Sequence, residues 1–83
     1  MLIEENWAID AERIREFFRC QDDVIESQND FYYGSCRITL TPLPTTQNSI
    51  FAVSRTRVQM DGPEDDLQII HRRFFLRFLS AGG

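Results

Sequence analysis

Two segments in which apolar and polar side chains alternate place the strongest constraint on the fold of this chain. Residues 31–41 carry apolar side chains at most even positions, and residues 50–60 show the same period of two. Successive side chains of a strand point to opposite faces of a sheet, so each segment is predicted to form a half-buried strand. Gly34 interrupts the first strand and is interpreted as a bulge, and Pro42 and Pro44 end it. We therefore expect an antiparallel pair of strands joined by a loop.

The segments on either side of this pair have the period of an amphipathic helix. In residues 10–20 the apolar side chains recur every three or four positions. The second helix is predicted to start at Asp61-Gly62-Pro63, because proline suits the first helical turn and the acidic residues that follow complement the helix dipole. Its buried stripe comprises Leu67, Ile70, Phe74 and Phe78. Further apolar residues widen this stripe beyond one face: Ile69, Phe75, Leu76 and Leu79. Such a width indicates more than one packing partner for the second helix.

These elements predict a small α+β domain in the order helix, two- or three-stranded antiparallel sheet, helix, with both helices on one sheet face. Val24 and Ile25 are the centre of the optional third strand. The chain of 83 residues has room for one core, so residues 1–83 are assigned to a single domain. A domain of this length buries a modest share of its surface, and oligomerisation would add to its stability.

The charge composition disfavours partners that carry many negative charges. Asp and Glu number 13 against 9 basic residues, all of them Arg, which gives a net charge of -4. Such a chain has no general attraction to nucleic acid or to anionic lipid. The longest apolar stretch is far below the ~20 residues that a membrane span needs. The opening sequence MLIEENW has two glutamates where a secretory signal would have basic residues, so we expect a cytoplasmic protein.

No residue pattern indicates catalysis, a metal or a cofactor. Cys20 and Cys36 lie far apart without a CxxC pair, and His71 is the single histidine, so the spacing of a metal site is missing. The chain also lacks a glycine-rich phosphate loop and a GxSxG nucleophile motif. We therefore predict a non-enzymatic protein without metal or cofactor, in which both cysteines are reduced.

If the helices cover the even-numbered strand face, the opposite face exposes aromatic and arginine side chains. Its members are Phe31, Tyr33, Arg37, Phe51, Val53, Arg55 and Arg57. Such a surface favours a dimer or partner interface, where aromatic residues and Arg are common. The alternative without a functional role is that these side chains are simply exposed to solvent or pack against the second helix. Bases could also stack on the rings while arginines meet phosphates, but the net charge disfavours this.

Arg73 and Arg77 form a second candidate site, because they lie one turn apart on the second predicted helix. An anion could bind at this compact cationic edge. The alternative without a bound anion is that the two side chains interact with the C-terminal end of their helix and with the acidic first helix.

The sequence therefore predicts a small protein-interaction or adaptor domain whose partner is a second copy or another protein. The contact surface is expected to be the aromatic and arginine sheet face or the second helix. The alternative function is a single-stranded nucleic-acid or nucleotide-binding module on the same sheet face. It would use Arg37, Arg55 and Arg57 with Phe31, Tyr33 and Phe51.

Overall fold

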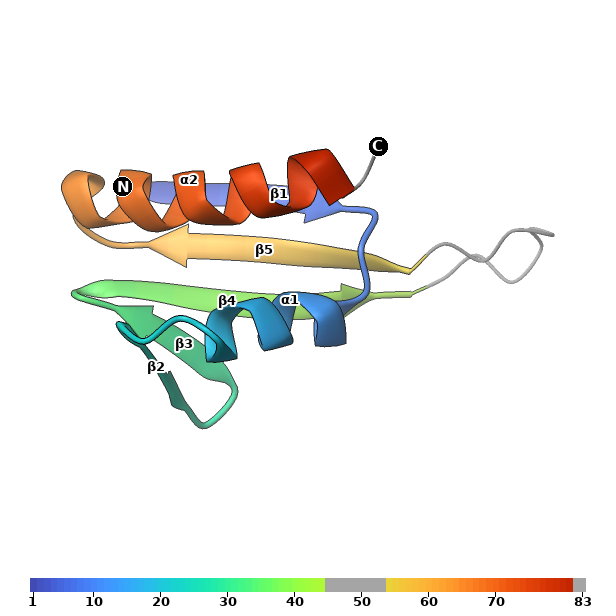
Figure 1. Ribbon diagram of the computed structural model, residues 1–83, viewed down its shortest axis with the longest axis horizontal. Helices are drawn as coiled ribbons and strands as arrows, with labels where there is room; N and C mark the ends of the chain where they lie inside the picture. The colour runs from blue at the N-terminus through green and yellow to red at the C-terminus, as the bar shows by residue number, and fades with distance from the viewer. Residues whose placement is uncertain (45–53, 82–83) are drawn as a thin grey trace, which may run out of the picture.

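The computed structural model describes residues 1–44 and 54–81, which form a five-stranded antiparallel sheet and two helices (Figure 1). The strands are β1 (Leu2–Trp7), β2 (Val24–Ser27), β3 (Asp30–Tyr33), β4 (Cys36–Leu43) and β5 (Arg55–Asp61). The helices are α1 (Ala11–Arg19), between β1 and β2, and α2 (Glu64–Ala81), after β5. The strands lie in the order β1-β5-β4-β3-β2. Both helices pack on the same face of the sheet, which we call the helix-covered face (Figure 1). Neither helix covers the opposite face of the sheet, which we call the helix-free face.

The predicted fold was wrong in its strand number and element order, although the domain is α+β. A strand precedes α1, and the sheet has five strands rather than two or three. The sequence of β1, LIEENW, places two apolar residues before two acidic ones, which hides the period of two. This segment pairs along its whole length with β5, from Leu2 opposite Asp61 to Trp7 opposite Thr56. Tertiary pairing therefore decides the state of a segment whose local pattern is ambiguous.

Residues 31–41 were predicted as one strand, and this was wrong because a tight turn at Gly34 and Ser35 divides them into β3 and β4. Tyr33 pairs with Cys36 across the turn. Gly34 has a φ of 57°, a left-handed conformation that glycine adopts without steric cost. The chain reversal places the odd positions of β3 on the same face as the even positions of β4.

The segment around Val24 and Ile25 does form a strand, β2, which lies at the edge of the sheet. It pairs with β3 through a second tight turn, formed by Gln28 and Asn29 between the paired residues Ser27 and Asp30. Gln28 also has a φ of 57°, without being glycine. Two short hairpins in succession therefore build one half of the sheet.

The core lies between the sheet and the two helices. The helices contribute Ala11, Ile14 and Phe18 from α1 and Leu67, Ile70, Phe74 and Phe78 from α2. The sheet contributes Phe31, Cys36, Ile38, Leu40, Val58 and Met60. Removing these apolar side chains from water is the main favourable contribution to folding. The sheet half of the core comes from three adjacent strands, so the helices hold β3, β4 and β5 in one layer.

Among the described residues, Thr56 is the polar side chain that is fully buried. Its Oγ1 donates a hydrogen bond of 2.7 Å to the carbonyl oxygen of Ile9, in the connection between β1 and α1. The bond satisfies a backbone acceptor that burial removes from water. Thr56 therefore fixes the connection before α1 against the first residues of β5.

We expect Thr56→Val to lower the free energy of unfolding by about 1–3 kcal/mol, because valine keeps the shape but leaves the Ile9 carbonyl without its donor. Urea unfolding followed by circular dichroism measures this change. Thr39→Val is the control, since Thr39 is half-exposed on the helix-free face and its replacement should change the value by less than about 0.5 kcal/mol. Equal effects of the two substitutions would contradict the role assigned to the buried hydroxyl.

Candidate functional site

The helix-free face carries mainly polar side chains in rows that cross the strands. One row consists of Leu2, Asp61, Arg37, Tyr32 and Ile25. A shallow cavity of about 280 Å³ lies beside it, lined by Leu2, Arg37, Thr39, Gln59 and Asp61. Its walls combine both signs of charge with neutral polar groups, which does not select one class of ligand.

The three arginines predicted on the sheet, Arg37, Arg55 and Arg57, lie on this helix-free face. Arg37 donates from Nε to Oδ2 of Asp30 at 2.8 Å, and this ion pair raises the pKa of the guanidinium. The Nε of Arg57 lies 3.5 Å from Oε1 of Glu4. Two of the three guanidiniums therefore already have carboxylate partners.

The aromatic residues predicted to join these arginines are not beside them. Phe31 is buried in the core, and Tyr33 is half-buried against it, so both lie on the helix-covered face. The tight turn after β3 is the physical reason, because it reverses which positions share a face. Phe51 and Val53 lie outside the described residues. The described part of the helix-free face has one tyrosine, Tyr32, rather than a set of stacking rings.

Arg73 and Arg77 have different surroundings although they lie one turn apart. The Nη1 of Arg73 lies 2.8 and 2.9 Å from the two carboxylate oxygens of Asp23, and its guanidinium lies 5.2 Å from the centre of the Tyr33 ring. The hydrogen bond between the Arg73 guanidinium and the Asp23 carboxylate lowers the pKa of Asp23 and raises the pKa of Arg73. The guanidinium of Arg77 lies 5.5 Å from the Phe78 ring centre. Arg73 therefore ties α2 to the start of β2, whereas Arg77 faces a groove.

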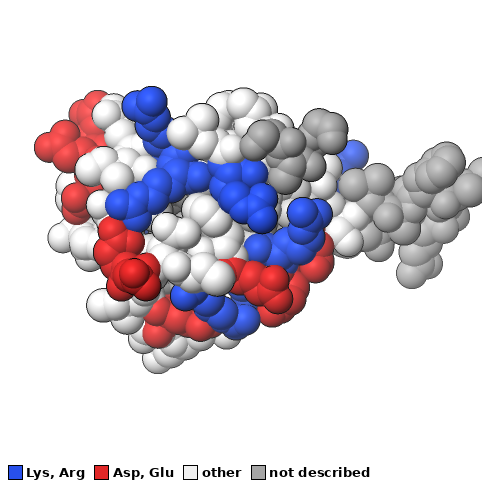
Figure 2. Space-filling view, viewed as in Figure 1, with Lys and Arg blue, Asp and Glu red and all other residues white. Residues whose placement is uncertain are grey.

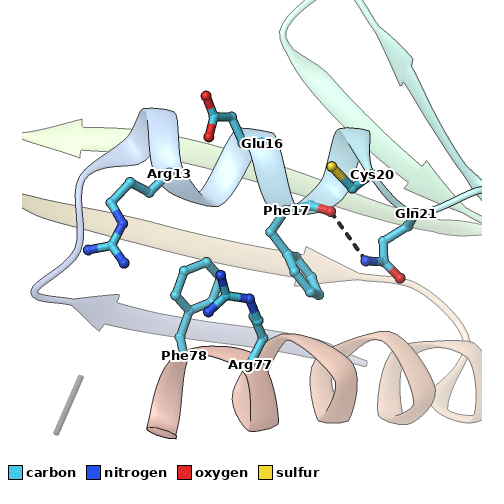
Figure 3. Close-up of a pocket in the computed structure, with 7 residues that line it drawn as sticks. All are labelled: Arg13, Glu16, Phe17, Cys20, Gln21, Arg77 and Phe78. Carbon is cyan, nitrogen blue, oxygen red and sulfur yellow. Dashed lines mark hydrogen bonds between the residues drawn. The ribbon is translucent and has the colours of Figure 1, made fainter. Parts of the chain in front are cut away.

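This groove lies between α1 and α2 on the helix-covered face and has a volume of about 310 Å³ (Figure 3). Arg13 and Phe17 from α1 and Arg77 and Phe78 from α2 line it. Figure 2 shows that basic side chains form a band across the centre of this face, with most acidic side chains nearer its margins. Sequence analysis missed the groove, because its two walls come from opposite ends of the chain and only the tertiary fold brings them together.

The outer side of α2 forms a second surface, which we call the α2 stripe: Asp65, Ile69, Arg72, Leu76 and Leu79. The spacings of four, three, four and three residues keep these side chains on one helical face. The three apolar members are 46–56% exposed, and Phe75 beside them is 36% exposed. A depression of about 410 Å³ lies at the first half of the stripe, lined by Asp65, Gln68, Ile69 and Arg72. The wide apolar pattern of this helix, noted from the sequence, corresponds to this surface.

Within residues 1–44 and 54–81, no three His, Cys, Asp or Glu side chains come together in a way that could hold a metal ion. Both cysteines are free, and burial raises the pKa of the Cys36 thiol, whereas Cys20 is exposed. In that same part of the chain, neither helix has the length and apolar character needed to cross a bilayer.

Comparisons of this chain with protein families, with curated proteins and with solved structures found no match.

Proposed function

We propose that this protein is a small non-enzymatic interaction domain that self-associates through the α2 stripe. One observation carries the proposal. The large apolar side chains that the described residues expose are Met1, Leu2, Ile25, Ile69, Phe75, Leu76 and Leu79, and four of these seven lie on α2. The others are spread over the N-terminus and the two edge strands. A contiguous exposed apolar surface is typical of a protein contact.

The charges along α2 favour a second copy in antiparallel orientation as the partner. Within the stripe, Asp65 lies in the first turn of α2, and Arg72 follows two turns later. In an antiparallel pair Asp65 of each helix can approach Arg72 of the other, and the helix dipoles also oppose one another. A parallel pair would align like charges instead. The stripe is therefore complementary to itself, as a two-fold interface requires.

The size of the stripe sets the expected strength of the dimer. α2 has 18 residues and a length of about 27 Å, so two such helices bury less than the roughly 800 Å² per partner of a standard interface. We therefore expect dissociation at micromolar concentration. Sedimentation velocity between about 1 µM and 1 mM should show the mass rise from 9.8 kDa to twice that value. A mass that stays at 9.8 kDa over the whole range would contradict self-association.

The alternative, single-stranded nucleic-acid binding on the sheet, has less support. Arg37 and Arg57 have carboxylate partners, and Phe31 and Tyr33 lie on the other face. Stacking on aromatic rings and free cationic groups are the two features that such binding needs.

We also propose that the protein is located in the cytoplasm. This location is supported by the two free cysteines, which are typical of a reducing compartment.

A further inference from the structure

The arginines of this chain fall into two groups when their carboxylate partners are compared. Arg15, Arg19, Arg37, Arg57 and Arg73 each have a carboxylate oxygen within 3.5 Å. The other four, Arg13, Arg55, Arg72 and Arg77, have no such partner among the described residues, although acidic residues outnumber arginines in the chain. Two of these four, Arg13 and Arg77, come from different helices, yet both line the groove between α1 and α2 (Figure 3). The groove therefore concentrates positive charge that the protein itself does not neutralise.

Aromatic rings form the apolar wall of the same groove. The centres of the Phe17 and Phe78 rings lie 5.6 Å apart at an angle of 69°, an edge-to-face contact. Phe78 is 2% exposed, so the core holds its ring in place. The guanidinium of Arg77 lies next to this wall, 5.5 Å from the Phe78 ring centre. An apolar group and an anionic group bound in the groove would thus each meet a matching surface.

The remaining polar groups of the groove do not oppose an anion. Gln21 donates from Nε2 to the carbonyl oxygen of Phe17 at 3.3 Å, which fixes its amide at one end of the groove. Glu16 also borders the groove, but its carboxylate lies on the side of α1 that is turned away from Phe78 and Arg77 (Figure 3). The volume of about 310 Å³ is at the lower end of the range for small-molecule sites.

We propose that this groove binds a small organic anion in which a phosphate or carboxylate is joined to a flat apolar group. Arg13 and Arg77 bind the oxyanion through charge-assisted hydrogen bonds, and the half-buried Phe17 ring, which the buried Phe78 ring holds in place, packs against the apolar group. The site does not depend on the proposed dimer, because Arg77 lies on a different side of α2 from the α2 stripe.

Phenyl phosphate and benzoate are the test ligands, because each joins an anionic group to a flat ring. Two partial ligands serve as comparisons: inorganic phosphate lacks the ring, and benzyl alcohol lacks the anionic group. Titrations of the full chain are followed by amide chemical shifts in two-dimensional NMR. We expect phenyl phosphate or benzoate to shift the amides of residues that line the groove, with an affinity at least about tenfold above that of either partial ligand. Which of the two binds more tightly distinguishes a phosphate from a carboxylate as the preferred group.

Two variants test the arginines, and a third is the control. Arg13→Gln and Arg77→Gln should each weaken the binding of the better ligand by about fivefold or more. Arg55→Gln removes the same charge from the helix-free face and should leave the affinity unchanged. All three residues are exposed, so the folded spectrum should persist in each variant. The proposal is overturned if the groove amides do not shift, if inorganic phosphate binds equally well, or if all three variants lose affinity alike.

Discussion

Phe74→Ala is expected to remove a large part of the free energy of unfolding of this domain. The Phe74 side chain is fully buried at the centre of the aromatic core. Its ring centre lies 5.0 Å from that of Trp7, 5.9 Å from Phe18 and 5.1 Å from Phe78. A substitution of this kind costs about 3–5 kcal/mol, through lost burial and the cavity left behind. At about 0.05–0.15 kcal/mol per residue, a chain of 83 residues has a total stability of about 4–12 kcal/mol, so the substitution removes a large part of it.

The neighbouring residue provides the control for this prediction. Phe75 has the same side chain and a contact with Trp7 at 5.8 Å between ring centres, but it is 36% exposed. Phe75→Ala should therefore lower the free energy of unfolding by about 1 kcal/mol. Urea unfolding followed by circular dichroism compares the two variants with the wild type. If Phe74→Ala were as mild as Phe75→Ala, the aromatic core described here would not be the main source of stability.

The difference between these two neighbours illustrates which features could be predicted from the sequence. The i, i+3, i+7 spacing of Leu67, Ile70 and Phe74 identified the buried side of α2, and Phe75 was among the apolar residues outside that side. Helical periodicity is a local property, so it is visible without the rest of the fold. The exposed surface of α2 was predictable for the same reason.

The sheet was harder to predict because its order and faces depend on pairing and turns. β1 has two adjacent glutamates, Glu4 and Glu5, which point to opposite faces, so no alternation of polarity marks it as a strand. The turn at Gly34 changes which residues of β3 and β4 share a face, and it placed Phe31 in the core instead of beside Arg37. One misplaced turn therefore changed the composition of a whole predicted surface.

The groove between α1 and α2 could not be predicted from local patterns in the sequence. Arg13 and Arg77 lie on helices at opposite ends of the sequence, and nothing local places them on one cavity. Arg73 shows the same dependence on tertiary structure, because its partner Asp23 is 50 positions away and was not predicted. Whether an arginine is neutralised or free is a property of the folded chain, and this property distinguishes Arg73 from Arg77.

Ile69→Glu is expected to dissociate the proposed dimer, with an increase of the dissociation constant by about 100-fold or more. Ile69 lies within the α2 stripe, between Asp65 and Arg72, and is 46% exposed. In a self-complementary interface the new carboxylate is buried twice, once from each copy, and it adds to the negative charge of Asp65. Glutamate is a good helix former, so α2 itself should remain intact. Sedimentation velocity measures the dissociation constant, and circular dichroism verifies the fold.

Ile25→Glu is the matched control, because it makes the same chemical change at an apolar side chain that is 68% exposed on the edge strand β2. If the α2 stripe is the interface, this variant dimerises like the wild type, since β2 lies at one end of the sheet, away from the outer side of α2. Should Ile25→Glu dissociate the dimer while Ile69→Glu leaves it intact, the interface would lie on the sheet instead, at the row in which Ile25 pairs with Tyr32. The two variants therefore distinguish the two surfaces that the sequence first indicated, the second helix and the sheet face, by one measurement on folded protein.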